Sequence, residues 1–188
     1  MKGLWFLRLL FYIPFYVFCL LAAPFVVVFA TPQDGATDNG TSHAVEPRLP
    51  HWLNWLQTPD NSLWGDSGWR TEHCRYWQSY FGMVCWLWRN PAYGLAWGPF
   101  AYVPQPGTTY STAGDPTIHA RDDARAGWYR ITSSDGAWER TSITRLGPFT
   151  KCLKLRTGWI LGDAQPGRPC LYLFSLRIMP FRPGAGRG

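Results

Sequence analysis

The chain has 188 residues and a formal net charge of +6; only 16% of its residues are charged, while 17% are aromatic. This length accommodates an apolar segment and one domain of ordinary size. The positive side chains are scattered and no run of five like charges occurs, so the sequence does not favour a nucleic-acid partner. Anionic lipid head groups are at least as good a partner for such a composition.

Residues 1–30 form the most informative segment, because residues 9–30 contain no charged side chain. As a helix this stretch would be about 33 Å long, close to the thickness of the hydrocarbon core of a bilayer. We therefore predict an uncleaved transmembrane or membrane-inserted helix. A signal peptide cleaved after Ala30 and a buried or interfacial hairpin are the alternatives, but the apolar core of a signal peptide is usually shorter. Pro14 and Pro24 each remove a helical hydrogen bond, which neighbouring groups must replace.

The positive charges around this segment predict its orientation. Lys2 and Arg8 precede the apolar stretch, and the next positive side chain is Arg48. Because positive flanks tend to remain cytoplasmic, we expect a cytoplasmic N-terminus and a main domain on the other side of the membrane.

Residues 31–48 are rich in Gly, Thr, Asp and Asn, which is typical of a flexible linker. The following Trp-rich segment, residues 49–103, begins with the helical spacing of Leu49, Trp52, Leu53 and Leu56. Two nearly uncharged stretches, 80–88 and 92–103, are each too short to span a bilayer. We predict membrane-adjacent helical and irregular structure here, because tryptophan is enriched at membrane interfaces.

The C-terminal part has the period of β-strands. Residues 104–126 are rich in Pro, Gly, Thr and Asp and are expected to form a loop. Four strands separated by short turns follow, at residues 127–133, 137–146, 151–161 and 170–179. They predict an antiparallel meander over residues 127–182 that packs with residues 49–103, before a disordered tail at 183–188. In the third strand Lys154 and Arg156 alternate with leucines and predict a solvent-exposed face. The predicted fold class is α+β.

Four cysteines outside the apolar segment could form two disulfides in an oxidising compartment, or remain reduced thiols: Cys74, Cys85, Cys152 and Cys170. If the last two strands form a hairpin, Cys152 lies at its open end and Cys170 near its turn, too far apart for a bridge. A bridge between Cys74 and Cys85 would require a break in the helix near Gly82.

The sequence contains no recognisable catalytic or cofactor-binding motif. Asp60, Asn61 and Asp66 could supply oxygen ligands, but their spacing does not fit a calcium loop. His73 and Cys74 lack the paired ligands typical of a zinc site. We therefore predict no metal site, no cofactor and no enzymatic activity.

Two motifs resemble a known family. LPHWLNWLQTPDNSLWGD and WLWRNPAYGLAWG, with the later KCLKLRTGWILG, are similar to a family of uncharacterised small proteins encoded by tailed phages and prophages. The matching residues, taken as candidate structural or interaction residues, are Trp52, Trp55, Gln57, Pro59, Asp60 and Asn61 in the first motif and Trp88, Arg89, Asn90, Pro91, Tyr93 and Gly94 in the second. The resemblance implies a bacterial host and makes its inner membrane the expected location.

Together these features predict a phage-encoded, membrane-anchored protein. It would act by contact with membrane lipid, or with a host envelope or phage protein, in superinfection exclusion or as a lysis accessory. The alternative is a virion or assembly component whose apolar N-terminus is an insertion segment.

Overall fold

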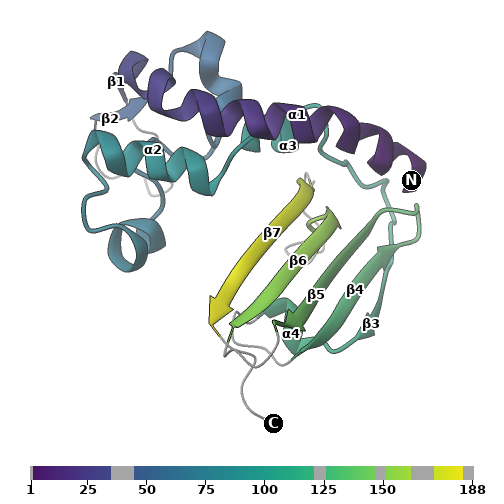
Figure 1. The fold of residues 1–188 in the computed structure, drawn as a ribbon. Helices are drawn as coiled ribbons and strands as arrows, with labels where there is room; N and C mark the ends of the chain where they lie inside the picture. The colour runs from purple at the N-terminus through teal and green to yellow at the C-terminus, as the bar shows by residue number, and fades with distance from the viewer. Residues whose placement is uncertain (1, 35–44, 121–125, 147–150, 162–171, 184–188) are drawn as a thin grey trace. The chain divides into compact units, whose positions relative to one another are not determined.

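The computed structural model of the chain describes residues 2–34, 45–120, 126–146, 151–161 and 172–183 (Figure 1). It divides into a Trp-rich unit, residues 7–99, and a sheet unit formed by residues 1–6 and 100–188. An N-terminal apolar helix and a five-stranded antiparallel sheet confirm the predicted α+β class.

Helix α1 (Lys2–Val26) continues into a short 3₁₀ turn, η1 (Val27–Phe29). Its apolar side chains favour a helix, and both Pro14 and Pro24 lie inside it. Within the described residues, Lys2–Phe29 is the one segment long and apolar enough to cross a bilayer. Residues 2–6 of this helix belong to the sheet unit and the remainder to the Trp-rich unit.

The segment expected to be a flexible linker is paired at both ends. Strand β1 (Thr31–Asp34) lies antiparallel to β2 (Val45–Arg48), with Thr31 opposite Arg48. The backbone hydrogen bonds of this ribbon order residues whose side chains bury little apolar surface, so the linker prediction is wrong for these eight positions. Residues 35–44 lie outside the described part.

The helix expected after Pro50 is a 3₁₀ helix, η2 (His51–Leu56). Leu49, Leu53 and Leu56 are buried as the pattern indicated, but Trp52 is 63% exposed. The tighter 3₁₀ geometry places residues i and i+3 in line. Leu53 and Leu56 therefore share a side, whereas Trp52 lies off it.

The two nearly uncharged stretches, 80–88 and 92–103, are helical to different extents. A single turn, η3 (Trp69–His73), precedes α2 (Tyr80–Arg89), which confirms the first stretch as a helix. Ser79 caps α2 because its hydroxyl oxygen accepts a hydrogen bond from the Gly82 N–H at 3.0 Å. The second stretch yields only α3 (Tyr93–Trp97), and residues 100–103 belong to the sheet unit.

The sheet unit is a meander in which sequence neighbours pair in the order β3-β4-β5-β6-β7 (Figure 1). Its strands are β3 (Tyr110–Gly114), β4 (Gly127–Ser133), β5 (Trp138–Arg145), β6 (Lys151–Trp159) and β7 (Phe174–Pro183). The predicted order and antiparallel pairing of the last four are confirmed. The loop expected at 104–126 instead contains β3 and the short helix α4 (Thr117–Ala120).

Strand β7 begins four residues later than expected, and its register places Cys152 opposite Arg182. Cys152 therefore lies at the end of the β6–β7 pair that is farther from the connecting turn, as predicted. Cys170 lies outside the described residues. Cys74 and Cys85 are free thiols, and α2 is unbroken at Gly82.

The covered face of the sheet contains Ile118 of α4 packed with Ile143 and Cys152. The expected solvent-exposed face of β6 is wrong, since Lys154 is buried and Arg156 forms an ion pair of 3.1 Å with buried Glu139. The second Glu139 oxygen accepts the Leu161 N–H at 2.7 Å. A charged side chain can enter a covered face when a partner of opposite charge lies there.

The first turns of α1 complete the sheet unit. Trp5 is only 4% exposed, its indole N–H donates to the Gly158 carbonyl at 3.2 Å, and its ring stacks on Phe174 at 5.7 Å. The N-terminal segment is thus part of this unit's packing and not only an appendage.

Candidate membrane-contact surface

Within the Trp-rich unit, α1 packs through one side. Tyr12, Cys19 and Val26 are buried at intervals of seven residues, close to two helical turns, and Ala23 joins them. Half-buried residues flank this side, and the opposite side is apolar and exposed. We call it the open face of α1; it consists of Leu7, Leu10, Phe11, Ile13, Val17, Phe18, Leu21, Phe25, Val28 and Phe29, each at least 46% exposed.

Trp88 of the second motif compensates for a proline in α1. In a regular helix the N–H of residue 24 would donate to the Leu20 carbonyl, but Pro24 has no N–H. The Trp88 indole donates to this carbonyl instead, with 2.9 Å between Nε1 and the oxygen. The Tyr80 hydroxyl likewise donates to the Pro24 carbonyl near the end of the helix. The compensation expected for Pro24 is therefore present.

Two tryptophans of the first motif also contact α1 and its 3₁₀ extension. The Trp55 ring stacks on Phe15 with centroids 4.8 Å apart and planes 13° from parallel. Trp52 meets Phe29 edge to face at 6.0 Å, and its carbonyl accepts the Trp55 indole N–H at 2.7 Å. Trp52, Trp55 and Trp88 remain 42–63% exposed, so they lie beside the open face as an aromatic border.

The two motifs meet where α3 packs on η2. A Cβ at Gly94 would lie 2.3 Å from the Trp55 carbonyl oxygen, so this contact requires glycine. The preceding turn contains buried Pro91 and Ala92, and Ala92 adopts a left-handed conformation with φ of 57°. Tyr93 stacks on Trp97 at 6.1 Å. The second motif therefore positions α3 against the first motif.

The buried side chain of Gln57 forms hydrogen bonds that stabilise the first motif. It is 2% exposed, its Oε1 accepts the Leu49 N–H at 3.0 Å, and its Nε2 donates to Asn54 Oδ1 at 2.8 Å. A cavity of about 390 Å³ adjoins this junction, and its lining includes four of the twelve candidate residues: Trp55, Gln57, Pro59 and Gly94. Within the described part of its lining, Arg48 is the one titratable side chain.

The other polar candidates have structural contacts. The Asn61 carbonyl accepts the Thr58 hydroxyl at 3.3 Å within the Pro-Asp-Asn turn, and Asp60 is exposed there. Asn90 donates to the Trp86 carbonyl at 3.3 Å at the end of α2, and the Arg89 guanidinium lies 5.6 Å above the Trp69 ring. The Arg89 and Asn90 side chains therefore contact α2 and its neighbour Trp69, the Asn61 backbone closes a turn, and these residues do not converge on one site.

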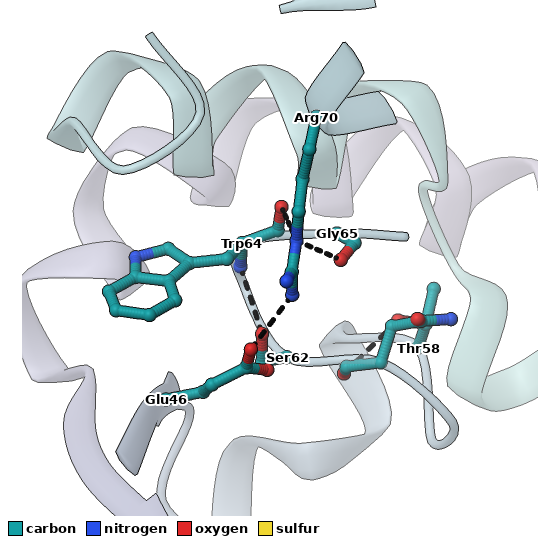
Figure 2. Close-up of polar contacts among 7 residues, drawn as sticks. Glu46, Thr58, Ser62, Trp64, Gly65 and Arg70 are labelled. Atoms are coloured by element: carbon teal, nitrogen blue, oxygen red, sulfur yellow. Dashed lines mark hydrogen bonds and ion pairs between the residues drawn. The ribbon is translucent and has the colours of Figure 1, made fainter. Parts of the chain in front are cut away.

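Arg70 is an organising residue that sequence reasoning missed (Figure 2). Its guanidinium forms an ion pair with Glu46 of β2 at 2.9 Å and donates to the Gly65 carbonyl, also at 2.9 Å. It also lies 5.0 Å above the Trp77 ring. The glycine at position 65 was the sequence signal for a tight turn. It adopts φ of +74°, and its carbonyl accepts the hydrogen bond from Arg70.

In the part of the chain that the structure describes, no three His, Cys, Asp or Glu side chains lie close enough together to bind a metal ion. Burial raises the pKa of the Cys85 thiol, and the nearby Cys74 raises it further. Cys85 therefore favours its protonated, less nucleophilic form.

Comparison with known proteins gives a family but no activity. The model of a family of unknown function, DUF7338, matches residues 1–185. No curated protein matches the chain, and no solved structure does.

Proposed function

The chain belongs to the DUF7338 family of unknown function, and we propose that it is a phage-encoded, membrane-associated protein that acts by contact at the envelope of a bacterial host. The open face of α1, bordered by Trp52, Trp55 and Trp88, is the observation that carries this proposal. Contiguous exposed apolar surface of this extent is unusual on a monomer in water. Indole rings with one polar atom are suited to the boundary between lipid and water.

The contacts of α1 favour a membrane-inserted helix over an isolated transmembrane anchor. The Trp-rich unit contacts this segment from Phe15 to Phe29, which corresponds to roughly 20 Å of helix. A bilayer core is about 30 Å thick, so α1 could cross it only by drawing these contacts into the hydrocarbon. We propose that α1 lies along one leaflet with its open face in lipid.

The location follows from the charges and from Trp5. Lys2 and Arg8 support an N-terminus on the cytoplasmic side of the inner membrane. Since Trp5 packs within the sheet unit, we propose that the sheet also remains on this side. This replaces the periplasmic position expected from charge asymmetry alone.

The motif resemblance supports a phage or prophage origin and, with it, a role in superinfection exclusion or lysis. The contacts of the polar motif residues support action by binding, because they serve turns and helix ends. Mass spectrometry of purified phage particles would contradict an envelope role if it found the protein at stoichiometric level in virions.

Cell fractionation tests the membrane proposal. We expect full-length protein in the membrane fraction, resistant to high salt and released by detergent. Leu21→Asp places a charge on the open face, where burial in hydrocarbon would cost about 2.5–3.5 kcal/mol, and should shift protein to the soluble fraction. Tyr76→Asp, at a 69% exposed position of the same unit, is the matched control and should not. Full-length wild-type protein in the soluble fraction, or a mature N-terminus at Thr31, would refute the proposal.

A further inference from the structure

The sheet unit contains a groove of about 770 Å³ that is separate from the open face of α1. Its floor is the face of β4, β5 and β6 opposite the one covered by α4, and the first turns of α1 supply one wall. Trp5 and Trp138, with ring centroids 5.4 Å apart, make part of the groove apolar. The groove is therefore open to a ligand with both polar and apolar parts.

The polar part of this groove has a single sign of charge. Among the residues that the structure describes, Lys2, Arg130 and Arg140 line it and no carboxylate does. Arg130 and Arg140 lie directly opposite each other in the β4–β5 register. Like charges in this arrangement repel and destabilise a sheet. An anion between the two guanidinium groups would remove this repulsion.

We propose that the groove binds the phosphate of an anionic phospholipid. Guanidinium groups present paired N–H donors that match phosphate oxygens, and the hydroxyls of Thr132 and Ser142 supply further donors in the lining. The Trp138 ring and the ring of Phe6, which is 60% exposed, provide a surface for the glycerol and the start of the acyl chains. That the phosphate belongs to a lipid rests on the proposed membrane contact of α1, the helix that contributes Lys2 and Trp5 to the lining.

Native mass spectrometry of the full-length chain, released from nonionic detergent micelles, tests this site. The probes are dioctanoyl phosphatidylglycerol, dioctanoyl phosphatidylcholine and inorganic phosphate. We expect phosphatidylglycerol to bind about tenfold more tightly than phosphatidylcholine, because the choline group of the latter carries a positive charge that the three cations of the lining repel. Arg130→Gln and Arg140→Gln should each weaken phosphatidylglycerol binding about tenfold.

Arg75→Gln is the matched control, because it removes the same charge at an exposed position of the Trp-rich unit. It should leave phosphatidylglycerol binding unchanged. The two groove variants should also fold. Without lipid, Arg130→Gln should unfold at a higher temperature than the wild type, since it removes the cross-strand repulsion and leaves the contact of the Arg140 guanidinium with the Trp128 ring, 5.6 Å away, intact.

Three results would overturn the proposal. Equal binding of the two lipids would show that the head-group charge is not recognised, and an equal loss in Arg75→Gln would show that only net charge matters. Displacement by inorganic phosphate at the same concentration as the lipid would assign the groove to a free anion. Because this binding is measured in detergent, it is independent of the fractionation result: a chain that is soluble in cells can still pass, and a membrane-bound chain can fail.

Discussion

Trp88→Phe tests the most specific contact between the Trp-rich unit and α1. The substitution keeps most of the ring but removes the N–H that donates to the Leu20 carbonyl at 2.9 Å. In a micelle, detergent around the open face excludes water from this carbonyl, and leaving it without a partner there costs about 1–3 kcal/mol. We expect the free energy of unfolding to fall by about 2 kcal/mol.

Pro24→Ala and Trp88→Phe together form a double-mutant cycle that tests this prediction. Pro24→Ala restores a backbone N–H at position 24, which can donate to the Leu20 carbonyl within the helix. Trp88→Phe should then cost about 1–2 kcal/mol less in the Pro24→Ala background than in the wild type, as expected for two groups that share one partner.

Urea unfolding of the full-length chain in nonionic micelles, followed by far-ultraviolet circular dichroism, measures all four corners of the cycle. Trp52→Phe is the matched control, because Trp52 is 63% exposed and contacts Phe29 through its ring edge. It should cost less than about 0.5 kcal/mol. Equal losses in Trp88→Phe and Trp52→Phe, or a Trp88→Phe loss that is the same with Pro24→Ala, would refute the proposed compensation.

Three further substitutions test the packing and the thiols. Gly94→Ala places a Cβ 2.3 Å from the Trp55 carbonyl oxygen and should cost about 1–3 kcal/mol in urea unfolding. Glu139→Ala removes a buried carboxylate and leaves the Arg156 guanidinium without its ion-pair partner. It should cost about 3 kcal/mol in the same assay. For Cys85, the rate of iodoacetamide alkylation, followed by mass spectrometry, should rise with pH at a higher midpoint than in the urea-unfolded chain. Cys74→Ser should lower that midpoint because it removes one cause of the raised pKa.

Each of these results has a matched comparison. Gly3→Ala adds a Cβ with nothing within 4 Å, and Glu72→Ala removes an exposed carboxylate, so both should be nearly neutral. Losses of equal size in these controls would contradict the packing arguments. Because the raised pKa of Cys85 favours the protonated thiol in the folded chain, its contribution to stability should fall as the pH rises above the thiol's unfolded pKa. A midpoint unaffected by Cys74→Ser would contradict the assigned cause.

Local patterns predicted the elements whose causes are local. Turn residues such as Ser134, Asp135 and Gly136 separated the strands of the meander, and the uncharged run from Tyr80 indicated α2. The β1–β2 ribbon was missed because its two strands are short, separated by ten residues and poor in apolar side chains. Its order comes from backbone hydrogen bonds, which leave little trace in composition.

The candidate residues show a similar division. The motifs were located by resemblance, but the partner of Trp88 is a carbonyl 68 residues away that is available only because of Pro24. Lys154 and Arg156 were assigned to solvent because alternation cannot indicate that Glu139 lies on the same face. Contacts across such separations depend on tertiary packing and not on spacing.

The burial of Trp5 has a consequence for how the chain is made. Trp5 leaves the ribosome well before its acceptor, the Gly158 carbonyl, which lies 153 residues downstream. At ordinary elongation rates this interval is roughly 8–30 s. Throughout it the nascent helix has no native cover for its first turns. Another apolar partner, such as a chaperone that holds apolar segments, can therefore engage these turns before the sheet exists.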